Sequence, residues 1–157
     1  MHPVLYAIIG VILILVIGPA IFADRSPIPE TSGNVTKVAA PADLTTLLAS
    51  SKYVVVDFYA DWCPPCRAIA PIFSALADEH ALAGKLAFAK VNVDHVKGVA
   101  AQYGISAMPT FLFFEGGEVK GVGVKGKAGD EVVEMVRGAD VVALRRVVQE
   151  LGRKARE

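Results

Sequence analysis

The residues of this chain best suited to chemistry are its only two cysteines, Cys63 and Cys66, in the stretch ADWCPPCRAIAP at residues 60–71. Two nearby cysteines can form a structural bridge, supply half of a metal site, or exchange electrons as a dithiol. A bridge that closes so small a loop constrains the unfolded chain little. The chain is 54% apolar, enough for a core without a bridge. A structural disulfide is therefore the weakest of the three interpretations.

A metal site within one chain is disfavoured because the sequence offers too few further ligands beside the cysteine pair. Structural zinc commonly takes four Cys or His ligands, and this sequence has no second cysteine pair. Its histidines are His2, His80 and His95. Two chains could share zinc or an iron-sulfur cluster through these thiols, which would be a binding function of another class. For the single chain we predict no metal and no organic cofactor.

The spacing after Cys63 predicts a helix that contains Pro71. Its core-facing stripe is Ile69, Ile72, Phe73 and Leu76. A cysteine at a helix N-terminus lies beside unpaired backbone N–H groups and the positive end of the dipole, which favours the thiolate. Cys63 is therefore the candidate nucleophile. Cys66, one turn further in, is placed to attack a mixed disulfide at Cys63 and release the product.

Strands and helices alternate along the rest of the chain, which is typical of an α/β domain with a parallel pair of strands. The predicted strands are residues 53–60, residues 86–93, and a hairpin formed by residues 110–119 and 131–138. The other predicted helices contain Leu44 to Leu48, Val96 to Tyr103 with Gly104 at the end, and residues from about Asp140 to Leu151. One domain accounts for this pattern.

Asp57 is out of place in the apolar strand at residues 53–60. A carboxylate buried without a partner is costly, so such groups are usually paired or protonated. Burial would also raise its pKa, so that the group could exchange protons near neutral pH. Asp57 is therefore a functional acid, a structurally paired core residue, or a sign that the strand prediction is mistaken.

Three segments in order resemble the thioredoxin family. They are VVVDFYADWCPPCRAIAP at 54–71, similar to the active-site segment, KVNVD at 90–94, and SAMPTFLFF at 106–114, similar to the cis-proline segment in its eukaryotic form. The resemblance covers about residues 39–154. It implies the thioredoxin fold, a central mixed β-sheet flanked by helices, and thiol-disulfide exchange through a dithiol without a cofactor.

Site residues follow from the same resemblance. It implies that Cys63 attacks, that Cys66 resolves, that Asp57 takes the proton from Cys66 through water, and that Lys90 is the cationic neighbour of Asp57. The implied substrate-facing residues are Trp62, Pro64, Pro65, Met108, Pro109 and Gly138, with a cis peptide between Met108 and Pro109. In the family, this proline also discourages metal capture by the thiols.

Two features depart from the usual family pattern. Pro64 replaces the usual glycine between the cysteines; WCPPC is frequent in tryparedoxins, nucleoredoxins and membrane-tethered thiol reductases. The distance from Cys66 to Pro109 leaves no space for the insertion usual in those reductases. The second departure is the Gly- and Lys-rich stretch at 116–130, either a flexible loop or a contact to a partner or to lipid headgroups through Lys120, Lys125 and Lys127.

The first part of the chain is predicted to lie outside the domain. Residues 4–23 are apolar without a charge, which favours a single-pass membrane anchor over a cleaved signal segment with Ala23 at the cleavage point. Residues 24–38 are predicted as a flexible linker, and residues 39–157 as the thioredoxin domain. Flanking charges favour a domain on the cytosolic or another reducing side, the alternative being a secretory lumen, where the sequon at Asn34 would matter.

The predicted function is a membrane-anchored thioredoxin that reduces protein disulfides and is re-reduced by a thioredoxin reductase or another thiol donor. The chain has 16 Lys and Arg residues and 16 Asp and Glu residues. Its net charge is therefore near zero, and it gives no indication that nucleic acid is a partner. The alternatives are a lumenal disulfide oxidase or isomerase, and a redox-sensing adaptor without turnover. The direction of exchange depends on potential and compartment, which the motif does not encode.

Overall fold

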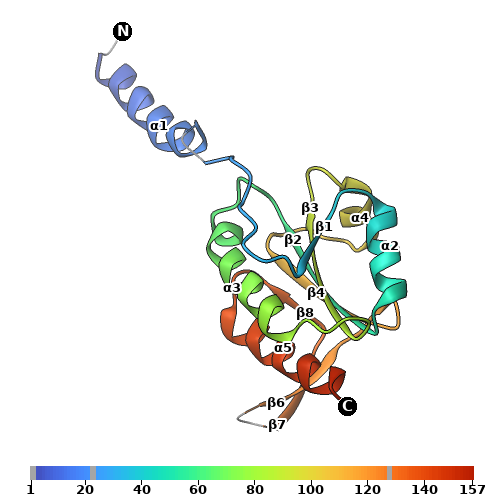
Figure 1. Cartoon of the computed structure of the whole chain (residues 1–157). Coiled ribbons are helices and arrows are strands. Elements are labelled where there is room, and N and C mark those ends of the chain that lie inside the picture. Colours follow the sequence, from blue (N-terminus) through green and yellow to red (C-terminus); the bar gives the residue numbers. More distant parts are fainter. Residues whose placement is uncertain (1–2, 22–23, 127–128) are drawn as a thin grey trace.

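The apolar run that contains Asp57 forms β2 (Tyr53–Tyr59), a central strand of the sheet. A computed structural model describes residues 3–21, 24–126 and 129–157. All seven residues of β2 are buried, because helices cover both faces of the sheet (Figure 1). A fully covered strand is expected to read as a continuous apolar run, which explains why residues 53–60 lack the alternation of a half-exposed strand.

In the described part of the chain the main sheet has six strands, with β1, β3, β2, β4 and β5 in that order. β1 (Val35–Val38) and β3 (Leu86–Asn92) are parallel, β3 is parallel to β2, and β4 (Thr110–Glu115) is antiparallel to β2. The short strands β5 (Glu118–Val119) and β8 (Met135–Arg137) both pair with β4. The predicted mixed sheet is confirmed.

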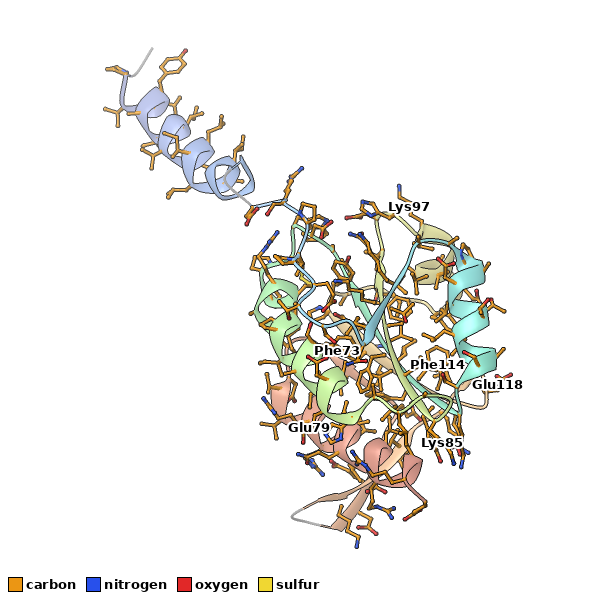
Figure 2. All side chains as sticks on the ribbon, in the orientation of Figure 1. Phe73, Glu79, Lys85, Lys97, Phe114 and Glu118 are labelled. Carbon is orange, nitrogen blue, oxygen red and sulfur yellow. A yellow bond between two sulfur atoms is a disulfide. The ribbon has the colours of Figure 1, made fainter. Side chains whose placement is uncertain are left out.

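Two apolar layers hold the helices on the sheet. One lies beneath α3 (Pro64–His80) and α5 (Val141–Ala155), and its centre is Phe73, whose ring lies 5.7 Å from that of Phe88 and 5.6 Å from that of Phe111. The other lies beneath α2 (Pro41–Ser50) and α4 (Lys97–Gln102) and includes Phe114. Figure 2 shows Phe73 and Phe114 on opposite sides of the sheet.

The Gly- and Lys-rich stretch is more ordered than a flexible loop. It forms most of a separate antiparallel hairpin, β6 (Val122–Gly126) with β7 (Gly129–Val133), at the end of the domain beside α5 (Figure 1). Val122 and Val124 are buried in the layer beneath α5. Residues 131–138 therefore divide between β7 and β8, instead of forming the single strand that we predicted. Lys127 lies outside the described residues.

The prediction of a membrane anchor at residues 4–23 is wrong, and with it the predicted single-pass membrane localisation and membrane partner. This run forms the helix α1 (Pro3–Ile21), which has 19 residues. Among the described residues, no helix is long and apolar enough to cross a membrane. Residues 22–23 of the predicted span, including Ala23, lie outside the described residues.

The segment between α1 and the sheet differs from the flexible linker predicted at residues 24–38. Its last four residues form β1, an edge strand of the sheet. Residues 24–34, which we call the strap, lie on the domain beside α3. Ser32 donates a hydrogen bond of 2.6 Å to Asp78 of α3, and the side chain of Ile28 is buried. The ordered domain therefore begins before residue 39.

Candidate active site

Cys63 and Cys66 form a disulfide at the N-terminus of α3. Cys63 is the N-cap residue, and the backbone N–H of Cys66 donates to its sulfur across 3.3 Å. Both side chains are buried, and they pack in a small apolar cluster with Ile28 and Met108. The same unpaired N–H groups and helix dipole that bind this sulfur would stabilise a thiolate at Cys63.

The two prolines of the motif suit the place where the fold puts them. Pro64 and Pro65 form the first positions of α3, where the backbone N–H has no intrahelical acceptor. Proline also fixes φ near its helical value, so the Cys-Pro-Pro-Cys stretch favours the start of the helix. Both prolines are exposed on the surface beside the cysteines. The replacement of glycine by Pro64 is therefore compatible with the helix.

The Met108–Pro109 peptide is cis, as predicted. It places the carbonyl oxygen of Met108 3.6 Å from the sulfur of Cys63. The carbonyl of Pro109 accepts a hydrogen bond of 2.7 Å from the N–H of Gly138, which has a φ of +77° that favours glycine. The segment at 106–114 and the loop after β8 are thereby held together next to the disulfide.

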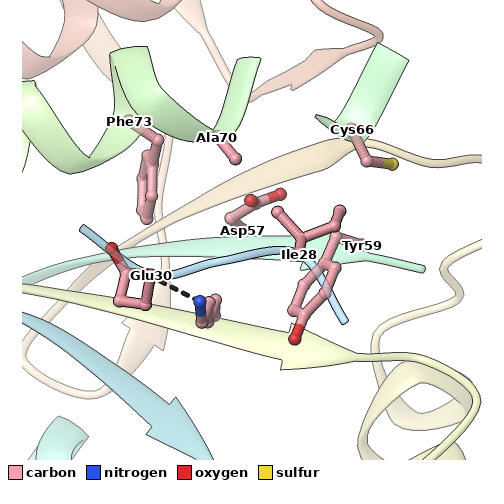
Figure 3. A pocket seen from close by; sticks show the side chains of 8 residues that line it. Ile28, Glu30, Asp57, Tyr59, Cys66, Ala70 and Phe73 are labelled. Atoms are coloured by element: carbon pink, nitrogen blue, oxygen red, sulfur yellow. Dashed lines mark ion pairs between the residues drawn. The ribbon is translucent and has the colours of Figure 1, made fainter. Parts of the chain in front are cut away.

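Asp57 lies beneath the cysteines, in the wall of a small cavity. The cavity measures about 10 Å³, close to the room that one water molecule needs. It is lined by Ile28, Glu30, Asp57, Tyr59, Cys66, Ala70, Phe73 and Lys90. Figure 3 shows Asp57 between Cys66 on one side and the ion pair of Glu30 on the other. The predicted acid and the predicted resolving cysteine thus share one cavity.

Burial dominates the electrostatics of Asp57. It raises the pKa of this carboxyl to about 7, the positive charge of Lys90 opposes the increase, and the negative charge of Glu30 adds to it. The Oδ1 atom of Asp57 is buried and has no hydrogen-bond partner among the described residues. This unpaired oxygen favours a functional acid over the structurally paired core residue that we kept open as an alternative, and the role of Asp57 stays a prediction. Asp57 can exchange a proton near neutral pH.

Lys90 is a cationic neighbour of Asp57 in the cavity wall, as predicted, but its ion pair is with another residue. Its ammonium forms an ion pair of 2.6 Å with Glu30 of the strap, and within the described chain it forms none with Asp57. Lys90 also lies over the ring of Tyr59, 5.7 Å from the ring centre. Sequence reasoning missed Glu30, because it belongs to a Pro-, Ser- and Thr-rich stretch that is typical of a linker.

Trp62 is exposed at the site, with 45% of its surface accessible. Its indole N–H donates a hydrogen bond of 2.8 Å to Asp94, which follows β3. Asn92, at the end of β3, binds the N–H of Asp94 and the carboxylate of Asp61. Sequence reasoning missed the roles of Asp61, Asn92 and Asp94, although Asn92 and Asp94 lie within the KVNVD segment.

The fold gathers the predicted site residues at one end of the sheet. Cys63, Cys66 and Pro109 lie at its centre, Asp57 and Lys90 lie beneath Cys66, and Trp62, Pro64 and Pro65 lie on the exposed surface. Gly138 reaches the site through its hydrogen bond to Pro109. Among the described residues no group of three or more His, Cys, Asp or Glu side chains could hold a metal ion.

The family profile described as Thioredoxin matches residues 35–138 of this chain. The chain belongs to the thioredoxin family. A thioredoxin-like protein of Fusarium culmorum is 53% identical over 110 residues, which are 70% of this chain and 84% of that protein. A thioredoxin of Neurospora crassa is 46% identical over 126 residues, which are 80% of this chain and 93% of that protein.

A solved structure of Schistosoma mansoni thioredoxin superposes with a TM-score of 0.59 at 35% identity, over 76% of this chain and 99% of that one. The chain is therefore a thioredoxin-type protein-disulfide oxidoreductase. Thioredoxins work through their active-site dithiol and disulfide without a cofactor. They act on protein disulfides and take electrons from thiol donors such as thioredoxin reductase.

Proposed function

We propose that this thioredoxin works as a reductase of protein disulfides, with Cys63 as the attacking and Cys66 as the resolving cysteine. The observation that carries the proposal is the position of Cys63 at the start of α3, against the cis Met108–Pro109 peptide. Helix N–H groups favour a thiolate there, and the extended segment before β4 offers backbone groups for a substrate chain.

The reaction proceeds in two exchanges. The thiolate of Cys63 attacks a substrate disulfide, so that a mixed disulfide forms and one substrate thiolate leaves. Cys66 then loses its proton and attacks the sulfur of Cys63, which releases the second substrate thiolate and closes the Cys63–Cys66 disulfide. The substrate gains two electrons and the dithiol loses two. A dithiol donor such as thioredoxin reductase returns them.

Asp57 serves as the proton acceptor for Cys66 in this scheme. Both residues line the same cavity, which has about the room for one water molecule to relay the proton. A carboxyl whose pKa is raised to about 7 by burial is a stronger base than an ordinary aspartate, and it is still ionised in part at neutral pH. Trp62, Pro64, Pro65 and Met108 form the surface that a substrate would approach, together with Pro109 and Gly138.

The direction of exchange is tested with the full chain, since residues before β1 pack on the domain. We expect it to reduce insulin disulfides with NADPH and a thioredoxin reductase, and to equilibrate with glutathione buffers as a strongly reducing couple. An oxidising couple that introduces disulfides into a reduced substrate would contradict the proposal in favour of an oxidase. A dithiol that exchanges once but does not turn over would contradict it in favour of an adaptor.

A further inference from the structure

The strap brings a second carboxylate to the cavity beneath the cysteines. Glu30 lies in the cavity wall together with Asp57 and Lys90, although it is 27 residues before Asp57 in the sequence. Its Oε2 atom accepts from the ammonium of Lys90 across 2.6 Å. The side chain of Lys90 is only 8% exposed, so water screens this ion pair weakly.

Further hydrogen bonds hold the Glu30 carboxylate in place. Its Oε1 atom accepts from the buried hydroxyl of Ser74 across 2.6 Å, and from the backbone N–H groups of Thr31 and Ser32. Burial alone would raise the pKa of Glu30, but the hydrogen bonds from Lys90, Ser74 and Ser32 outweigh it and lower that pKa below its ordinary value. Glu30 is therefore a fixed anion at neutral pH.

Asp57 and Glu30 compete for one cation. Lys90 is the register partner of Asp57 on the neighbouring parallel strand, so both side chains leave the sheet on the same face. Within the described chain the ammonium nevertheless pairs with Glu30. The other titratable groups that face the cavity are Tyr59 of β2 and Cys66 of α3.

We propose that Glu30 is a positioning residue of the dithiol reaction, which holds the Lys90 ammonium so that the carboxylate of Asp57 stays unpaired and free to take the proton of Cys66. The inference rests on the proposed function of Asp57 as the proton acceptor. An Asp57 carboxylate paired with Lys90 would be a weaker base, and proton removal from Cys66 would slow. The strap thus contributes to the reaction as well as to the fold.

Ile28 of the strap also lines the cavity. Its side chain is buried against the cluster that contains both cysteines, and its N–H donates a hydrogen bond of 3.0 Å to Asp61. Arg67 of α3 donates hydrogen bonds to the carbonyls of Asp24 and Ser26. The strap is therefore anchored on both sides of Glu30, since Ser32 binds Asp78 beyond it.

The test is an NMR titration of the Asp57 carboxyl carbon in the oxidised full-length protein, where the cysteines do not titrate. We expect a midpoint near pH 7 for the unchanged chain. In Glu30→Gln the amide keeps the size of the side chain but not its charge, and Lys90 is released to Asp57. We expect the midpoint to fall by about one pH unit or more, because an opposite charge nearby favours the ionised form.

Two further variants separate this role from a structural one. Ser26→Ala removes a hydrogen bond from the strap to Asp24 without touching Glu30 or its anchors, so its Asp57 midpoint is expected to stay that of the unchanged chain. In a Lys90→Met background, Glu30→Gln is expected to cause a much smaller shift than with Lys90 present. The inference would be overturned if Glu30→Gln caused no shift, if it caused an equal shift with and without Lys90, or if Ser26→Ala caused an equal shift.

The functional readout is the rate at which a preformed mixed disulfide at Cys63 is resolved. We expect this rate to fall several-fold in Glu30→Gln above pH 7 and to recover in part in Glu30→Asp, which restores the charge. If the protein without substitutions does not reduce disulfides with turnover, the proposed function is refuted. A chain that turns over, but whose resolution rate does not respond to Glu30→Gln, would overturn only the role of Glu30.

Discussion

Asp57 and Lys90 are register partners on the parallel strands β2 and β3, yet the ammonium of Lys90 pairs with Glu30 of the strap at 2.6 Å. The carboxyl of Asp57 is therefore buried without a cation bound to it, directly beneath Cys66. Such a group is costly for the fold when it is ionised. Its persistence in the core is consistent with a role in proton transfer.

Replacing Asp57 by Asn is expected to stabilise the protein and to slow its reaction. Burial raises the pKa of Asp57 to about 7 from an ordinary 3.8, so the folded state favours the protonated form. The stability that this group contributes is complete below about pH 4 and is lost as pH rises through 7. At pH 8 the loss is on the order of 4 kcal/mol, and Asp57→Asn would recover much of it.

Urea denaturation at pH 4, 6 and 8 measures this effect. The difference in unfolding free energy between Asp57→Asn and the unchanged chain should grow with pH, while the rate of mixed-disulfide resolution falls at least tenfold. A variant that is equally stable at all three pH values relative to the unchanged chain would contradict the buried, raised-pKa description of Asp57.

Gly152 of α5 is expected to tolerate no larger residue, because the imidazole of His80 lies against it. A Cβ atom at this position would lie 2.7 Å from the Nδ1 atom of His80, which is itself buried. Overpacking of this kind typically costs about 1–3 kcal/mol, although alanine is otherwise the better helix former. Gly152→Ala should therefore lower the unfolding free energy.

The matched control is Gly98→Ala in α4, where an added Cβ meets nothing within 4 Å. That change should leave stability equal or raise it by up to about 1 kcal/mol. Of two glycine-to-alanine changes in helices, only Gly152→Ala is thus predicted to lower the unfolding free energy in the same denaturation experiment. If Gly152→Ala were as well tolerated as Gly98→Ala, the close packing of α3 against α5 would be wrong.

The hairpin of β6 and β7 is expected to contribute to stability through one of its faces. Val124 is buried in the layer beneath α5, whereas Val132 on the paired strand is 69% exposed. Val124→Ala should cost about 2 kcal/mol, and Val132→Ala should stay within about 0.5 kcal/mol of the unchanged chain. Thermal unfolding of the two variants decides between a packed hairpin and a mobile loop, for which both changes would be neutral.

Much of the fold was predictable, because strands and helices leave periodic patterns in the sequence. The apolar run at 53–60 predicts a central strand covered on both faces. The spacing of Ile69, Phe73 and Leu76 predicts the buried face of α3. The hairpin was harder to predict, because its glycines and lysines are typical of loops. The signal was present in the alternation of Val122 and Val124 with glycine, since successive strand residues point to opposite faces.

The candidate site was predictable only where a residue contradicts its surroundings or lies in a motif. Asp57 stands out as a charge in an apolar strand, and Cys63, Cys66 and Pro109 lie in motifs. Glu30 gives no such signal, because its partners Ser74 and Lys90 are 44 and 60 residues away and are reached only through the folded strap. The apolar run at residues 4–23 likewise predicted a membrane anchor, whereas among the described residues no helix is long and apolar enough to cross a membrane.

The central claim is that Cys63 attacks and Cys66 resolves, and trapping of the mixed disulfide tests it most directly. The full-length variants Cys66→Ser and Cys63→Ser would each be mixed with an oxidised protein substrate, and the adducts identified by non-reducing electrophoresis and mass spectrometry. We predict a stable adduct at Cys63 in Cys66→Ser, and far slower adduct formation in Cys63→Ser. An adduct that forms faster at Cys66 in the second variant would contradict the assignment.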